Sequence, residues 1–147
     1  MRRAVLLTTA CLAALALAHP ALAQSAMSMG VYLWTNPAAE PVRTQFLSIA
    51  GTSAEVEIDG PEGSNAISRS ATPTETALLK TAIEGQMKAL TLTERPQPAT
   101  PYVTVEWHFS TPTGYADGAV NYAPDKVPAA VLALQQAAFG ATFAGGQ

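Results

Sequence analysis

Cysteine is almost missing from this 147-residue chain, since Cys11 is the only one. It lies within the first 23 residues, which have the features of an export leader: basic Met1-Arg2-Arg3, an apolar stretch from Ala4 to Ala18, and the cleavage pattern Ala21-Leu22-Ala23. A mature chain starting at Gln24 would hold no disulfide, thiol nucleophile or thiolate metal site. Its fold must therefore be stabilised by packing alone.

Long apolar runs are also lacking after the leader. The leader's own apolar stretch, Ala4 to Ala18, is shorter than the roughly 20 residues that span a bilayer, and no later run approaches that length. We therefore expect a periplasmic or secreted protein with no membrane insertion. The expected organisation is a signal peptide over 1–23 and a single secreted domain over 24–147, a suitable length for one core.

Basic residues are few. Removal of Arg2 and Arg3 leaves six of the eight Lys and Arg against eleven Asp and Glu, a formal charge of −5. Nucleic acids and anionic membrane surfaces both require a basic footprint, so neither is an expected partner. A basic or neutral partner fits this charge better.

Known catalytic and cofactor-binding sequence motifs are absent too. There is no P-loop, dinucleotide fingerprint or G-x-S-x-G serine elbow, and His108 is the single histidine after the leader. One histidine without cysteine does not make a zinc site. Asp59, Glu62 and Asn65 could offer oxygens to calcium, but their spacing is not that of an EF-hand and we interpret them as a polar turn. We predict no catalytic residue, no metal and no cofactor.

The strongest pattern that is present runs from Tyr102 to Ser110, Y-V-T-V-E-W-H-F-S. Its alternation places Val103, Val105, Trp107 and Phe109 on one face, and Tyr102, Thr104, Glu106 and His108 on the other. This is the period of a half-buried strand. Burial of each apolar side chain should contribute about 1.5 to 3 kcal/mol, so this strand anchors the predicted fold.

Three strands are expected before the anchor strand, over Met29–Thr35, Val42–Ala50 and Ser53–Asp59, and they would form an antiparallel meander. The core face of the second is ambiguous, because Phe46 points opposite to Leu47 and Ile49. The Gly-, Pro- and Ser-rich segment from Gly60 to Ala71 is expected to be a loop, with at most a brief extended piece at Ala66-Ile67.

Two helices are expected. Thr72-Pro73-Thr74-Glu75 is a capping box that begins the first, whose apolar stripe would be Leu79, Ile83, Met87 and Leu90. Gly85 within it implies either a close backbone approach or a weak last turn. An extended connector over Arg95–Pro101 leads to the anchor strand, and Tyr115–Tyr122 could form a short returning strand.

The second helix should open at Pro124-Asp125, with Asp125 as cap and Pro128 in its first turn, and end at Gly140. Its stripe would be Val127, Val131, Leu134 and Ala138. The resulting order is β-β-β-α-β-(β)-α. It predicts a two-layer α+β sandwich in which an antiparallel sheet of four to five strands has both helices on one face and the other face open. Many small exported domains share this order, some of them inhibitors. The order is therefore too generic for functional residues to be assigned to this chain by analogy with any of them.

The open face is the predicted functional surface. Tyr32, Trp34, Tyr102, Glu106 and His108 should lie on it, and Tyr and Trp are side chains that recognition patches use. We therefore expect a non-enzymatic binding module for an unidentified protein or small ligand. Two alternatives stay open: a small hydrolase or lyase using Glu106 and His108, and an envelope protein that homodimerises through this face.

Overall fold

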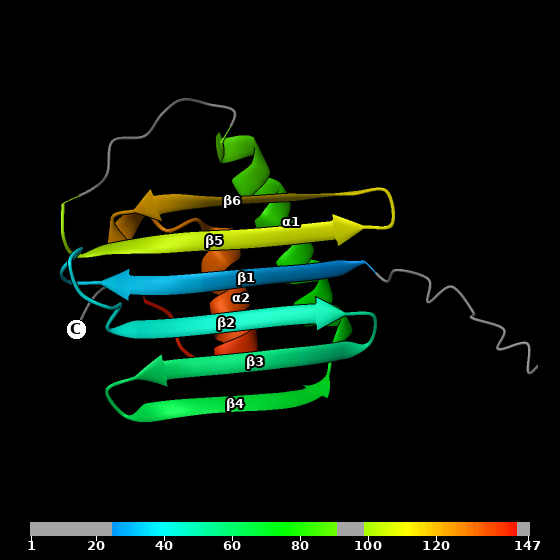
Figure 1. Cartoon of the computed structure of the whole chain (residues 1–147), viewed down its shortest axis with the longest axis horizontal. Helices are drawn as coiled ribbons and strands as arrows, with labels where there is room; N and C mark the ends of the chain where they lie inside the picture. Colours follow the sequence, from blue (N-terminus) through cyan, green and yellow to red (C-terminus); the bar gives the residue numbers. More distant parts are fainter. Residues whose placement is uncertain (1–24, 91–98, 144–147) are drawn as a thin grey trace, which may run out of the picture.

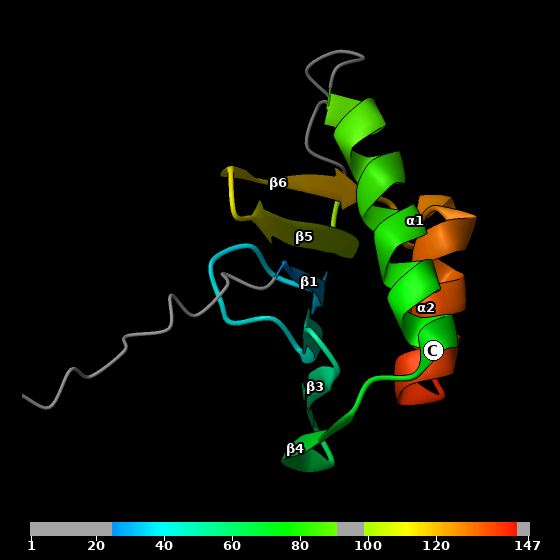
Figure 2. The same cartoon turned by 90° about the vertical axis from the view of Figure 1, so that its right-hand side faces the viewer.

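The structure, a computed structural model, describes residues 25–90 and 99–143. It consists of a six-stranded antiparallel sheet and two helices packed on one face of that sheet (Figures 1 and 2), so the predicted α+β class is confirmed with one strand more than expected. The predicted leader and most of the predicted connector before Tyr102 lie outside the described residues. The elements are β1 (Ala26–Trp34), β2 (Arg43–Ala50), β3 (Ser53–Gly60), β4 (Gly63–Ser70), α1 (Pro73–Leu90), β5 (Tyr102–Thr111), β6 (Gly114–Tyr122), a 3₁₀ turn (Pro124–Lys126) and α2 (Ala129–Phe139).

The strand order in the sheet is β4-β3-β2-β1-β5-β6. The first four strands form a meander, β5 and β6 form a hairpin, and the two units join where β1 pairs with β5 through partners such as Val31 and Val105. β1 begins three residues earlier than predicted, at Ala26. The predicted anchor strand thus lies next to the first strand in the middle of the sheet.

The predicted loop over Gly60–Ala71 is wrong, because most of it is β4. Pro61 and Glu62 form a two-residue turn, and Gly63 supports it with a φ of 117°, a conformation that favours glycine. The strand then follows β3 in register, with Ile67 opposite Val56. Its sequence has no clear apolar alternation, so pairing with β3 rather than burial of its own side chains defines it.

One hydrophobic core lies between the sheet and the helices. Val103, Val105 and Trp107 of β5 are buried there as predicted, while Phe109 is only partly buried at the margin. The ambiguity of β2 is resolved in the same way, since Leu47 and Ile49 face the core and Phe46 does not. The core also contains residues from other strands, from both helices and from the segments on either side of α2: Met29, Val31, Ala54, Val56, Leu79, Ala82, Ile83, Val120, Tyr122, Val127, Val131, Leu134 and Phe143.

The capping box of α1 is confirmed. The backbone N–H of Glu75 donates to Thr72 Oγ1 at 3.1 Å, and the N–H of Thr72 donates back to Glu75 Oε2 at 3.0 Å. Arg69 of β4 also binds the Glu75 carboxylate, which is buried. This ion pair joins the edge of the sheet to the first turn of α1.

The predicted stripe of α1 is correct at Leu79 and Ile83, which are buried, but wrong at Met87, which is 40% exposed. At about 100° per residue, Met87 is rotated about 80° from Leu79, whereas Gln86 is within about 20° of it. Gln86 accordingly takes the buried position. The side chain of Leu90 lies outside the described residues.

Gly85 is exposed, and a Cβ there would meet no heavy atom within 4 Å. A close backbone approach is therefore excluded as the reason for this glycine. We expect Gly85→Ala to raise the free energy of unfolding by about 0.5 to 1 kcal/mol, because alanine loses less backbone entropy in a helix. Urea denaturation measures this. Gly140→Ala is the control and should destabilise, since Gly140 has a φ of 70°; equal effects at both positions would contradict the explanation.

The start of the second helix was predicted wrongly. Pro124–Lys126 forms a separate 3₁₀ turn, and α2 begins at Ala129 with Pro128, not Asp125, at its N-cap. The physical reason is Pro128, because the residue before a proline is driven away from the helical region. The predicted end is confirmed, as Gly140 adopts the left-handed conformation and its N–H donates to the Gln136 carbonyl at 3.1 Å.

Buried glutamines connect the two layers. Gln135 Nε2 of α2 donates to Gln45 Oε1 of β2 at 2.9 Å, and Gln45 Nε2 donates to the Ala141 carbonyl at 3.1 Å. On the other side, the Tyr122 hydroxyl of β6 donates to Gln86 Oε1 at 2.9 Å. Because buried polar groups need partners, these bonds fix where each helix sits on the sheet.

Candidate functional site

The face of the sheet turned away from the helices, which we call the open face, is the candidate functional surface (Figure 2). Strand alternation and pairing place five exposed acidic side chains on it. They are Glu55, Glu57, Asp59, Glu106 and Asp117. Among residues 25–90 and 99–143 no Lys or Arg lies on this face, because Arg43 and Arg69 alternate onto the helix side and the lysines belong to α1 and the 3₁₀ turn.

A pocket of about 160 Å³ lies near the middle of the open face, across β1, β2, β5 and β6. Its walls combine aromatic rings with carboxylates and the histidine. The side chains that give it this character are Tyr32, Phe46, Glu106, His108 and Asp117. The pairing of Gly30 with both Phe46 and Glu106, and of His108 with Asp117, brings these residues together from four strands.

Gly30 gives the pocket its floor. A Cβ at this position would lie 2.4 Å from the Tyr32 hydroxyl and 2.7 Å from its ring, so the tyrosine ring lies against the glycine backbone. A ring packed over a strand glycine compensates for the missing side chain. Any larger residue at position 30 would push the Tyr32 ring out of this place.

Tyr32 and Glu106 are joined by a hydrogen bond in which the phenol donates to the carboxylate. Burial raises the pKa of the Tyr32 hydroxyl, and the negative charges of Glu106 and Glu57 raise it further. The phenol therefore stays protonated at neutral pH and keeps donating to Glu106. This bond orients the carboxylate at the side of the pocket.

His108 is positioned by residues of β6 rather than by Glu106, which lies two residues before it on the same face of β5. Its ring stacks on Tyr115 of β6, with centroids 6.1 Å apart and planes 23° apart, and Asp117 is its cross-strand partner. Tyr115 is 76% exposed. Glu106 and His108 share the pocket, but Glu106 is oriented by Tyr32 and His108 by the β6 residues.

Trp34 and Tyr102 lie on the same side of the sheet but at one end of it. They are cross-strand partners whose rings stack with centroids 6.1 Å apart and planes 15° apart. Tyr102 is only 5% exposed. Figure 2 shows the β1–β2 connection, in cyan, standing out from the sheet on this side. Of the five predicted binding residues, Tyr32, Glu106 and His108 line the pocket, whereas Trp34 and Tyr102 pack on each other.

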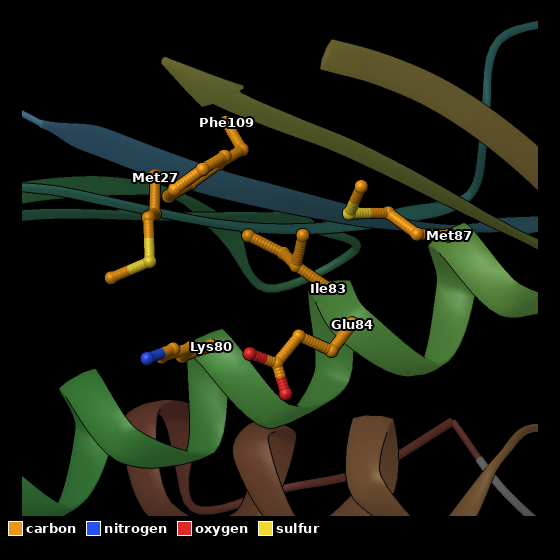
Figure 3. Close-up of a pocket in the computed structure, with 6 residues that line it drawn as sticks. All are labelled: Met27, Lys80, Ile83, Glu84, Met87 and Phe109. Carbon is orange, nitrogen blue, oxygen red and sulfur yellow. The ribbon is translucent and has the colours of Figure 1, made fainter. Parts of the chain in front are cut away.

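A second pocket, of about 250 Å³, lies on the helix side between α1 and the ends of β1 and β5 (Figure 3). Met27, Ile83, Met87 and Phe109 give it an apolar lining, with the charged Lys80 and Glu84 of α1 beside it. Apolar walls can hold an apolar molecule, but they offer few groups that would orient one. The open face therefore has the stronger claim to a specific role.

The described ranges contain no group of three or more His, Cys, Asp or Glu side chains that could hold a metal ion. In the same ranges, no helix has the length and apolar character needed to cross a membrane. A scan against models of protein families, a search of curated proteins and a search of solved structures each found no match. Functional inference therefore depends on the geometry of the open face.

Proposed function

We propose that this chain is an exported, non-enzymatic binding module that recognises a positively charged partner through its open face. The observation that carries the proposal is the charge of that face: five exposed carboxylates and, within the described residues, no Lys or Arg beside them. Unpaired charges of one sign attract a complementary surface and speed its docking.

The pocket gives this attraction a specific centre. A lysine ammonium or an arginine guanidinium placed in it would lie against the faces of Tyr32 and Phe46 and would donate hydrogen bonds to the carboxylates of Glu106 and Asp117. A volume of about 160 Å³ suits one such side chain rather than a large ligand. The remaining acids, on β3, lie beyond the pocket, so an extended basic polypeptide uses more of the face than a small molecule does.

Both alternatives have less support. A hydrolase or lyase would need Glu106 to orient His108, but the Glu106 carboxylate accepts from Tyr32 and the imidazole stacks on Tyr115. A homodimer through the open face would bring five carboxylates against the same five of a second copy. Like charges placed opposite one another destabilise an interface, so this pairing is disfavoured.

The test uses a tetra-arginine peptide as probe and measures its affinity by isothermal titration calorimetry at low and at physiological salt. We expect the double variant Glu106→Gln/Asp117→Asn to bind the probe about tenfold more weakly, because charge-assisted contacts at the pocket are lost. The matched control is Glu84→Gln/Asp125→Asn, which removes two exposed carboxylates from other surfaces. Equal losses in the two double variants would contradict a specific site.

Gly30→Ala separates the pocket from the general charge of the face. The new methyl group displaces the Tyr32 ring while every carboxylate is kept, so we expect weaker binding of the same peptide without a change in net charge. Thermal unfolding shows whether the variant is folded. A folded Gly30→Ala with unchanged affinity would mean that the charge of the face, and not the pocket, binds the probe.

A further inference from the structure

β4 forms an outer edge of the sheet, and its free side presents backbone groups to solvent (Figure 1). The N–H of Ala71 donates to the Thr52 carbonyl, and in an antiparallel ladder bonded pairs alternate along the strand. Odd-numbered β4 residues therefore bond β3, and the N–H and C=O groups of Ser64, Ala66 and Ser68 point outward. The edge offers a row of donors and acceptors to another strand.

This edge lacks the devices that block such pairing. Natural edges carry proline, lysine or a bulge, whereas β4 contains no proline or lysine and follows β3 in unbroken register. Its only charged residue, Arg69, is turned to the helix side and bound to Glu75. The outward residues Ser64, Ala66 and Ser68 are small, so a second backbone can approach closely.

The two faces beside the edge differ in chemistry. On the open face, β3 carries Glu55, Glu57 and Asp59 at every second position. On the helix side, Ile58 and Ile67 remain 37% and 46% exposed. A strand added to β4 would have one set of side chains near the acids and the alternate set near the isoleucines.

The distance from an added strand to the β3 acids favours long basic side chains on the face of the added strand that lies on the acidic side. An added strand would lie about 10 Å from β3, two strand spacings away, with only the small β4 residues between. Lysine and arginine are long enough to cross much of that gap and approach the carboxylates. A second copy of this chain fits less well, because its β4 would place only small, uncharged side chains on the acidic side, since Arg69 is turned to the helix side and bound to Glu75.

We propose that the β4 edge binds an extended segment of a protein partner that alternates basic and apolar residues, adding it to the sheet as a seventh strand. Main-chain bonds to β4 would supply affinity, and the alternation would supply specificity. The inference rests on the proposed function for the positive charge of the partner, but it does not depend on the pocket.

The test uses a synthetic eight-residue peptide of alternating lysine and valine, capped at both ends, and a version N-methylated at all eight residues. N-methylation removes the backbone donors of both edges, so the peptide cannot pair through an unmodified edge by reversing its direction, and it keeps the charge. Titration calorimetry compares the two peptides on the full chain. We expect the methylated peptide to bind at least about tenfold more weakly, because several backbone hydrogen bonds are lost. Equal affinities would overturn strand addition.

Variants of the chain locate the contact. Ala66→Pro removes an outward N–H, which an edge strand tolerates, and should weaken binding of the unmodified peptide about tenfold. Ala119→Pro, at an outward position of the opposite edge strand β6, is the matched control and should bind as the parent does. Thermal unfolding reports folding; if Ala66→Pro does not fold, Ser68→Pro, which also removes an outward N–H and leaves every open-face carboxylate in place, replaces it with the same expected loss.

The outcomes separate the two proposals. Weaker binding in Ala66→Pro alone supports the edge, and weaker binding only in Glu106→Gln/Asp117→Asn overturns the edge while the open-face proposal stands. A mass that doubles with concentration in the parent and not in Ala66→Pro would show that a second copy occupies the edge, which also overturns the inference.

Discussion

Replacing Leu79 with alanine is expected to lower the free energy of unfolding by about 3 to 4 kcal/mol, a large part of the stability of a domain this size. Leu79 is fully buried on the inner side of α1, where the helix meets the sheet. The loss combines the transfer free energy of the removed atoms with the cavity that they leave. Urea denaturation followed by circular dichroism measures it.

Lys80→Ala is the control for this prediction, because the neighbouring side chain is exposed on the same helix. Its effect should stay within about 0.5 kcal/mol. A Leu79→Ala protein that loses less than about 1 kcal/mol would show that α1 is not packed on the sheet at this point.

Acid should weaken the wild-type fold through Glu75, and Glu75→Gln should remove most of that sensitivity. The hydrogen bond from Arg69 is the main cause that holds the pKa of Glu75 at about 2, below its ordinary 4.5, and burial opposes it. Because the pKa is depressed in the folded state, the stabilisation is complete above about pH 4.5 and is lost as the pH falls through about 2. We expect it to be about 2 to 3 kcal/mol, discounted because Arg69 is 31% exposed.

Glu75→Gln keeps a side chain suited to the capping box, so the helix start should persist. The variant should be less stable at pH 7 by about 2 kcal/mol and should show a flatter stability profile between pH 5 and 2. Urea titrations at several pH values give both curves, with Glu84→Gln on the exposed side of α1 as the charge-matched control. Parallel curves for wild type and Glu75→Gln would mean that the ion pair adds no stability.

Local sequence signals predicted the elements whose own side chains are buried. The alternation of β5 identified both its core residues and its open-face residues, and Thr72 with Glu75 located the start of α1. In these segments the pattern and the tertiary environment agree. The same agreement explains why the α+β class and the placement of both helices on one face could be predicted.

Elements defined by their neighbours were missed. β4 has no apolar face of its own and is a strand because β3 lies beside it, which no local pattern records. The inner face of α1 was predicted from four-residue steps, which drift away from the helical period, so Met87 was given the place that Gln86 holds. Pro128 delayed the second helix although the preceding residues resemble a helix start.

The candidate site was predicted in part for the same reason. Periodicity correctly placed Tyr32, Glu106 and His108 on one face, but Asp117 and Gly30 join them through strand register, which links distant parts of the chain. A two-residue turn between Thr111 and Gly114 was the signal that could have placed Asp117 opposite His108. Periodicity also cannot show whether other residues cover a side chain on a given face of the sheet. Tyr102 was therefore expected at the surface, but it is almost fully buried.

The pairing of β1 with β5 in the middle of the sheet has a consequence for how the chain folds. Contacts such as Val31 with Val105 join residues that are far apart in the sequence, and closing so long a loop slows the search for the native state. During synthesis the β1–β4 meander can form early, but one side of β1 stays unpaired until β5, in the last third of the chain, is made. Until that moment one edge of β1, with its unpaired N–H and C=O groups and the apolar face beside them, has no partner strand, so protection from aggregation matters most in this interval.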